Sequence, residues 1–409
     1  MAPRTANQQI IGRLQEPITT EGRVLHDLLT AHLPTIRAAA PDNDRHGTFP
    51  TEVFEGLRKD GVLGATVPRE LGGLGVSCLH DVMFALLTVA GADGSTALAL
   101  HMQLSRALTL TYDWQHGSAG ASALAERLLR RMGTGEAIIC TGVKDIVRDK
   151  VVTTLTPGEQ GGWLLSGGKT LVSLAPVATH FMIFARLEGE DGRPHLATAV
   201  VGRDDPGLTV TDNWDGLGMR ASGSVDVVFD RCRIAADDVF FRGPFDDQPP
   251  AALAGQTISS INMLGIYTGL AQAARDIAVS TLVRRRMPPA GGPATLVTEI
   301  DARLYSLRST VAAAVAEIEE LSGDTTGDMD ERGHRMMLPF QLAKLTVNRL
   351  APGIVADCMT LVGGASYSAS HPLARLHRDV RAGAFMHPYT YGDAVDYLSG
   401  RALDISRDD

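Results

Sequence analysis

Apolar residues recur at intervals of three and four positions along residues 23–131, for example in VLHDLLTAHL, EVFEGLRKDGVLG and HDVMFALLTVAGADGSTALALHMQLSRALTL. This spacing places apolar side chains on one face of an α-helix, so it predicts a series of amphipathic helices. Closely spaced glycines in residues 67–75 disfavour helix and predict a loop. We predict a helical N-terminal domain over residues 1–135.

The pattern changes near Glu136, where short stretches rich in β-branched and aromatic residues replace the helical period. They include EAIICTGV, GWLLSGGKTLVS, THFMIFARL and SVDVVFDRCRI, and turn residues such as Gly167-Gly168 punctuate them. Because no helical segments intervene, the spacing predicts an antiparallel sandwich or barrel-like sheet rather than βαβ units. We predict a middle antiparallel β domain over residues 136–245.

The helical period returns after the proline-rich residues 244–250 and continues to the end of the chain. Three segments, which begin ISSINMLG, VTEIDARL and LPFQLAKL, have the length and apolar stripe of bundle helices, and residues 288–293 and 323–333 are predicted as the loops between them. We predict a C-terminal four-helix bundle over residues 246–409. The predicted fold class is therefore α+β multidomain, with the order helices, sheet, helices.

Composition narrows the classes of function. Of the 409 residues, 44% are hydrophobic and 21% are charged, as in an ordinary soluble protein, and no apolar run stands out as a membrane span. The net charge of −9 argues against nucleic acid as a partner. The four cysteines lack zinc-ligand spacing, so we predict neither a metal site nor disulfides. The N-terminus lacks a secretory pattern, and we expect a cytoplasmic protein.

Four motifs in this order resemble the acyl-CoA dehydrogenase superfamily. They are VPRELGGLG at residues 67–75, LGMRASGSVDVVF at 217–229, TLVGGASY at 360–367, and the pair Arg378-Asp379. The resemblance implies a flavin between the β domain, the C-terminal bundle and a neighbouring subunit, hence a homodimer or homotetramer. The implied flavin is FAD, or FMN if the reaction is a monooxygenation.

The resemblance also places residues at the flavin. Ser173 falls where a hydroxyl can bond to flavin N5, and Arg285 falls where the family places an arginine on the flavin pyrophosphate of the partner subunit. The turn after Thr141 departs from the family, with Gly142-Val143-Lys144-Asp145 in place of a Gly-Ser turn. The full predicted set of cofactor contacts is Thr141, Leu171, Val172, Ser173, Arg285, Val362, Gly363 and Gly364.

The catalytic carboxylate of the family is missing. An acyl-CoA dehydrogenase removes the α-proton of a thioester with a glutamate, which by position corresponds to His387 here. Some members carry the glutamate on the first long helix of the C-terminal bundle, and that position is Ser259. Neither usual base is present.

Three functions follow from this departure. The favoured one is dehydrogenation of an acyl thioester on coenzyme A or an acyl carrier protein, with His387 as the base and with an electron-transfer flavoprotein as a candidate electron acceptor. The alternative is a monooxygenase of the same fold, in which reduced flavin from a flavin reductase reacts with oxygen at C4a to form a (hydro)peroxide that hydroxylates a heteroatom or an aromatic ring of a small molecule. His101, on a helix that would face the substrate, is a second catalytic candidate in either case. A non-catalytic scaffold is the third, which the retained cofactor residues oppose.

Overall fold

The N-terminal part of the chain is helical, as its apolar spacing predicts. The computed structural model describes residues 14–146, 152–158, 161–189, 192–245, 249–285, 291–323, 326–386 and 390–403. Its first helices are α1 (Thr20–His46), α2 (Thr51–Lys59), α3 (Leu79–Ala90), α4 (Gly94–His116) and α5 (Ala119–Gly133). The Asp93 side chain caps α4 by accepting a hydrogen bond from the Thr96 backbone N–H at 2.8 Å. Almost every residue of α3 is buried, so this helix is an internal one.

A single eight-stranded sheet follows, with the path β6-β7-β3-β2-β4-β5-β8 and with β1 paired to β4. The strands are β1 (Ile139–Gly142), β2 (Thr154–Pro157), β3 (Trp163–Val172), β4 (His180–Glu188), β5 (Pro194–Gly202), β6 (Leu208–Val210), β7 (Val225–Ile234) and β8 (Val239–Pro244). Most neighbours are antiparallel, as predicted, but β1 and β2 both pair with β4 in parallel. The sheet is therefore mixed.

One predicted turn is wrong. Gly167 and Gly168 lie inside β3, which continues through them. Gly167 has a φ of +133°, and a Cβ at this position would lie 2.6 Å from the Cα of Thr153. Glycine is thus required here because the neighbouring backbone approaches too closely for a side chain, and not because the strand ends.

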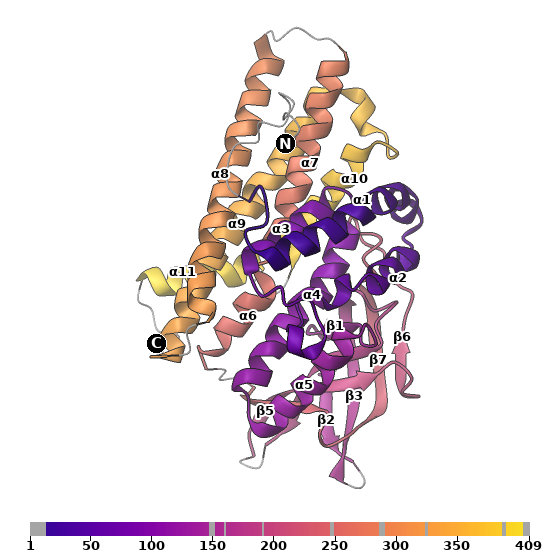
Figure 1. Ribbon diagram of the computed structural model, residues 1–409, viewed down its shortest axis with the longest axis vertical. Coiled ribbons are helices and arrows are strands. Elements are labelled where there is room, and N and C mark those ends of the chain that lie inside the picture. Colours follow the sequence, from indigo (N-terminus) through magenta and orange to yellow (C-terminus); the bar gives the residue numbers. More distant parts are fainter. Residues whose placement is uncertain are drawn as a thin grey trace.

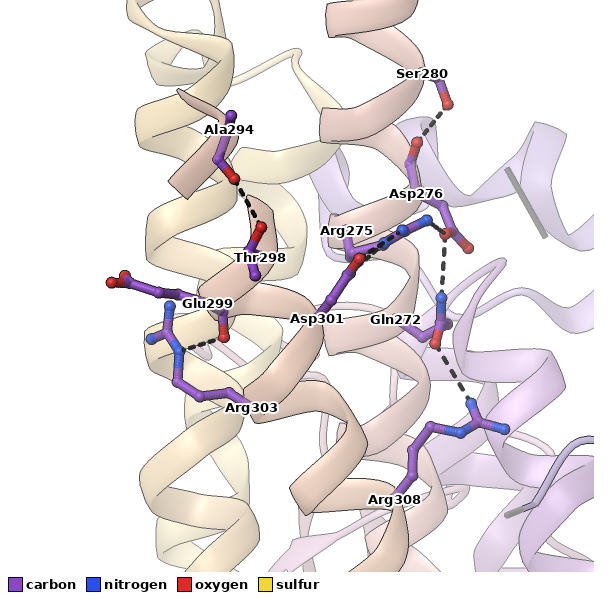
Figure 2. A network of polar contacts seen from close by, with 10 residues as sticks. All are labelled: Gln272, Arg275, Asp276, Ser280, Ala294, Thr298, Glu299, Asp301, Arg303 and Arg308. Carbon is purple, nitrogen blue, oxygen red and sulfur yellow. Dashed lines mark hydrogen bonds and ion pairs between the residues drawn. The ribbon is translucent and has the colours of Figure 1, made fainter. Parts of the chain in front are cut away.

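The C-terminal part returns to helices: α6 (Ala252–Ser260), α7 (Met263–Arg284), α8 (Gly291–Ser322), α9 (Met329–Val362), α10 (Pro372–Asp379) and α11 (Tyr391–Leu403). Helix α9 packs against α6, α7 and α8. Polar contacts join α7 to α8, as Figure 2 shows: the Arg275 guanidinium donates to both carboxylate oxygens of Asp301 at 2.8 and 3.0 Å, and Arg308 donates to Gln272.

Helices α8 and α9 begin inside the segments predicted as loops. The Asp328 side chain accepts hydrogen bonds from the Asp330 and Glu331 backbone N–H groups, and so starts α9 well before the predicted apolar stripe. Within the described residues, α9 is also the one helix that is long and apolar enough, by length and composition alone, to cross a bilayer. Core helices of bundles pass the same test, and α9 lies among three others.

Helix α4 connects all three parts of the molecule. It packs against β1 of the sheet and against α6 and α7 of the C-terminal part. Figure 1 shows the N-terminal helices between the tall C-terminal bundle and the sheet. One large apolar core includes buried residues from all three parts, and a smaller core lies around α5, β1 and β4. Side chains of α4 that point toward the sheet therefore lie where the three parts meet.

Candidate active site

The end of β3 presents an apolar side chain to the outside. Leu171 has a left-handed backbone conformation with a φ of +60°, and it is 45% exposed. The register of β3 against β7 shifts between Lys169 and Val172, and such an irregularity redirects side chains at a strand end. Leu171 thus offers an apolar surface to a planar ring. The Val172 side chain is buried, so only its backbone is available to a ligand.

Ser173 belongs to a chain of three buried hydroxyls. Its Oγ lies 2.7 Å from the Ser224 Oγ, which lies 2.6 Å from the Ser222 Oγ. Three hydroxyls carry three hydrogens, and the two contacts use two of them, so one hydrogen remains for another acceptor. The resemblance pointed to Ser173, whereas its two partners come from the loop after Gly218 and were not predicted.

We expect Ser224→Ala to lower the free energy of unfolding by about 1–2 kcal/mol, because the hydroxyls of Ser173 and Ser222 then lose a buried partner. Urea unfolding monitored by circular dichroism measures this. Ser399→Ala, which removes an exposed hydroxyl on α11, is the control and should change little. Equal stability of the two variants would show that the central hydroxyl contributes nothing.

The end of β1 lies beside a cation from α4. The Arg106 Nε donates to the Thr141 Oγ1 at 3.1 Å, and its Nη1 donates to the Thr109 Oγ1 at 3.0 Å. Thr141 and Arg106 are both half-buried. Burial first, and then the charge of Arg242, lower the pKa of Arg106 to about 10, so the guanidinium remains protonated at neutral pH.

The segment after Thr141 is fixed to β3 by an ion pair. The Lys169 Nζ donates to Asp145 at 2.8 Å and to the Val143 carbonyl at 3.1 Å, and the Thr153 hydroxyl donates to the same carboxylate. Backbone hydrogen bonds from Ile146 to Gly168 and from Thr170 to Lys144 continue this contact. The departure from the family turn is therefore an ordered alternative, and it brings the ends of β1 and β3 together.

Two motifs that are far apart in the sequence also meet. The Met219 backbone N–H donates to the Asp379 Oδ1 at 2.6 Å, and a Cβ on Gly218 would lie 2.4 Å from the Arg378 backbone. Arg378 in turn donates to both carboxylate oxygens of Asp44 on α1 at 3.0 and 2.6 Å. The Arg-Asp pair thus joins α1, the loop before β7 and α10.

The predicted pyrophosphate residues form a separate group. The Arg285 Nη1 donates to the Val362 carbonyl at 2.9 Å, at the end of α9. Gly363 and Gly364 are exposed, and a Cβ on either would meet no atom within 4 Å. Figure 1 shows this end of α7 and α9 at the end of the bundle away from the sheet. Within one chain, these four residues do not adjoin Thr141, Leu171 or Ser173.

The catalytic candidates differ in what the structure says of them. His101 is buried, its Nδ1 has no partner among the described residues, and burial followed by the charge of Arg106 lowers its pKa to about 4. Its imidazole is therefore neutral at neutral pH. His387 lies outside the described residues. The Ser259 hydroxyl donates to the Gln256 carbonyl of its own helix, so this position holds no acid or base.

Sequence reasoning missed Arg106, Asp145, Lys169 and Lys344. The Lys344 Nζ donates to the Met386 carbonyl at 2.6 Å, immediately before His387, and burial lowers its pKa to about 8. For Arg106 and Lys344 the sequence did carry a signal, namely a cation at an apolar position of a helical pattern, as in SRALTL and QLAKLTV. Such a cation needs a specific partner because an unpaired buried charge is costly.

The residues at the two strand ends fit a flavin. Leu171 provides an apolar face, the hydroxyls of Thr141 and Ser173 provide polar contacts at the ring edge, and Arg106 provides positive charge. A flavin ring needs these three features because it is planar and apolar on its faces, polar at one edge, and electron-rich when reduced.

Comparison with known proteins identifies the family. Three family models match: "Acyl-CoA dehydrogenase, N-terminal domain" over residues 26–136, "Acyl-CoA dehydrogenase, middle domain" over residues 146–232, and "Acyl-CoA dehydrogenase, C-terminal domain" over residues 261–387. The chain is 57% identical over 408 residues to L-evernosamine nitrososynthase of Micromonospora sp., which covers 100% of this chain and 96% of the relative. It is 57% identical over 407 residues to amino sugar nitrososynthase RubN8 of Streptomyces rubradiris, covering 100% and 95%.

A solved structure is similar to this chain over almost its whole length. KijD3, in complex with FMN and dTDP-3-amino-2,3,6-trideoxy-4-keto-3-methyl-D-glucose, is 62% identical with a TM-score of 0.94, and the alignment covers 97% of each chain.

These findings correct the predicted reaction. Dehydrogenation of an acyl thioester, with His387 in place of the glutamate, is wrong as the favoured function, because relatives and a solved structure at 57–59% identity over almost the whole chain are nitrososynthases. The broader prediction of a flavin-dependent oxidoreductase is confirmed, whereas FAD in particular is not, since the KijD3 structure contains FMN. The chain belongs to the acyl-CoA dehydrogenase family.

Proposed function

We propose that this protein is a flavin-dependent nitrososynthase that oxidises the amino group of a dTDP-linked amino sugar to a nitroso group. The observation that carries the proposal is identity of 57–59% over almost the entire chain to nitrososynthases, and KijD3, which is 62% identical, has been solved with FMN and a dTDP-linked amino sugar. The lack of an acid at Ser259, where some thioester dehydrogenases carry their base, supports it from the structure. An amine with a free electron pair needs no carbon-bound proton removed before it reacts with an electrophilic oxygen.

The overall reaction requires electrons as well as oxygen. One amine and two molecules of oxygen, with four electrons and four protons, give one nitroso group and three molecules of water. We propose that a flavin reductase supplies the electrons as reduced flavin, and that FMN is the flavin, because KijD3 has been solved with it. Bound flavin would pass electrons to oxygen and so supply the oxidising group.

The chain's own residues would provide binding and orientation. Leu171 would present its apolar side chain to the ring, while the Ser173 and Thr141 hydroxyls would hold the polar edge. The imidazole of His101 is buried and neutral, because burial and the charge of Arg106 lower its pKa to about 4, so it would form hydrogen bonds to a polar group but is a weak proton acceptor. The apolar core around α4 excludes water from this region.

The proposal is tested by incubating the purified protein with FMN, a flavin reductase, NADPH, oxygen and a dTDP-linked amino sugar. We expect a product in which two hydrogens of the amine are replaced by one oxygen, detected by mass spectrometry, and no product without oxygen or without the reductase. An acyl-CoA is the control substrate, which should not bleach the flavin under anaerobic conditions. Bleaching by the acyl-CoA, or the absence of product from every amino sugar offered, would overturn the proposal.

A further inference from the structure

Among the described residues, Arg106 at the end of β1 has no carboxylate within ion-pair distance. Within the described residues it forms hydrogen bonds to two threonine hydroxyls and no ion pair. Asp113, a nearby carboxylate on the same helix, is occupied by Arg242, whose Nη1 and Nη2 donate to its two oxygens at 2.7 and 2.8 Å. Asp113 therefore forms its direct ion pair with Arg242, while its charge acts on Arg106 only from a distance and raises the pKa of that guanidinium against the larger effects of burial and Arg242.

The other cation in this region shows the contrast. Lys169 also lies beside the end of β1, and a Cβ on Gly142 would lie 2.9 Å from its side chain. Its charge is compensated by Asp145 at 2.8 Å. A half-buried charge without an ion-pair partner is costly in a region of low dielectric, so Arg106 is suited to act on an anion outside the described residues, such as a bound ligand.

The direction of the hydrogen bond points to the identity of that anion. The Arg106 Nε donates to the Thr141 Oγ1, and a hydroxyl that accepts from a guanidinium keeps its own hydrogen for another acceptor. Thr141 is the residue that the proposed function places against the flavin. The Arg106 guanidinium would thus be connected to the flavin through the Thr141 hydroxyl. Because hydrogen bonds in a chain polarise one another, the guanidinium makes this hydroxyl a stronger donor.

We infer that Arg106, acting through Thr141, balances the negative charge that the flavin acquires on reduction. This inference rests on the flavin site of the proposed function. In this role Arg106 acts through Thr141 and does not contact the sugar. Its positive charge stabilises reduced flavin more than oxidised flavin. Oxidised flavin is neutral in its ring, so the cation discriminates between the two states and is not merely a binding contact.

The test is the midpoint potential of the FMN-loaded protein, measured by equilibration with a redox dye. We expect Arg106→Gln to weaken the preference for reduced over oxidised flavin about tenfold, which for a two-electron couple lowers the potential by about 30 mV. Sulfite, which adds to flavin and leaves a negative charge on it, should bind about tenfold more weakly. Arg106→Lys keeps the charge and should restore most of both quantities.

Matched controls separate this role from others. Arg130→Gln removes an exposed arginine that pairs with Glu126 on α5, and should leave the potential unchanged. Thr141→Val keeps the cation but removes the hydroxyl, and should lower the potential in the same direction, so it tests the inference even where Arg106→Gln does not fold. An unchanged midpoint potential in Arg106→Gln or in Thr141→Val overturns the inference.

Two further outcomes are distinguishable. If Arg106→Gln leaves the potential unchanged but weakens the binding of dTDP, measured by calorimetry, the arginine is a phosphate anchor and the inference is overturned. If the unmodified protein takes up neither FMN nor FAD, the proposed function fails, and the inference fails with it.

Discussion

Lys169→Met is expected to lower the free energy of unfolding by about 3 kcal/mol and to weaken flavin binding. The substitution keeps the volume of the buried stem but leaves the Asp145 carboxylate with only the Thr153 hydrogen bonds. Removing one member of a buried ion pair costs about 3–5 kcal/mol, and we expect the lower end because the Asp145 side chain is 32% exposed. Urea unfolding and FMN titration by fluorescence quenching measure the two effects.

The two members of this pair differ in their surroundings. Burial lowers the pKa of Lys169 despite the neighbouring carboxylate, whereas burial alone would raise the pKa of Asp145, and the hydrogen bonds from Lys169 and Thr153 outweigh it and lower that pKa. Lys169 is also the more deeply buried of the two, since its side chain is 3% exposed. A double variant, Lys169→Met with Asp145→Asn, removes both charges and should recover part of the lost stability. If the double variant is no more stable than Lys169→Met, the unpaired carboxylate was not the cause.

The fold was predictable because its elements follow from local pattern. The apolar period of three and four defines α1 to α5 and α7 to α9, and β-branched runs define the strands. The features that were predicted wrongly depend on contacts between residues that are distant in the sequence. Gly167 read as a turn because nothing local reveals that the Thr153 backbone lies against it. The parallel pairing of β1 and β2 with β4 is likewise a property of the assembled sheet, and not of any one strand.

The residues of the candidate site also fall into those that the sequence indicated and those that only the structure shows. Thr141 and Ser173 were found through family motifs, and the structure places them at strand ends that lie side by side. The spacing marks Arg106 as a cation at an apolar position but does not say which group it contacts, and Lys169 could not be assigned from type or spacing, since a cation on a strand is usually solvated. Their roles depend on which carboxylates are near and already occupied, which only the three-dimensional arrangement shows. The absence of a glutamate at the positions of His387 and Ser259 left the reaction open in the sequence, and the nitrososynthase relatives show that the preference for a thioester dehydrogenase was wrong.

A buried carboxylate from the Arg-Asp pair is a source of pH dependence. Asp379 is fully buried, and its Oδ2 has no partner among the described residues. Burial and then the carboxylate of Asp93 raise its pKa from 3.8 to about 7, against the opposing effects of the Met219 N–H and the Arg375 guanidinium. Asp44 adds to the rise, and Asp379 in turn contributes, after burial, to raising the pKa of the buried Tyr267 hydroxyl.

The sign of the effect follows from proton binding. Below about pH 4 the carboxyl is protonated in both the folded and the unfolded chain. Between about pH 4 and about pH 7 the folded chain keeps the proton that the unfolded chain has lost, so raising the pH favours unfolding. Above about pH 7 both states are ionised and the contribution no longer changes. A shift of about 3 pKa units corresponds to about 4 kcal/mol across this window.

Asp379→Asn is expected to abolish this component, because asparagine keeps an oxygen for the Met219 N–H but does not ionise. The free energy of unfolding of the unmodified protein should fall by about 2 kcal/mol more than that of the variant between about pH 5 and about pH 7, measured by urea unfolding at each pH. Glu320→Gln, which removes an exposed carboxylate on α8, should keep the original slope. Asp93→Asn removes the neighbouring charge and so lowers the pKa of Asp379 in the folded chain. The free energy of unfolding should then stop falling at a lower pH than in the unmodified protein. An unaltered slope in Asp379→Asn would assign the pH dependence to another group.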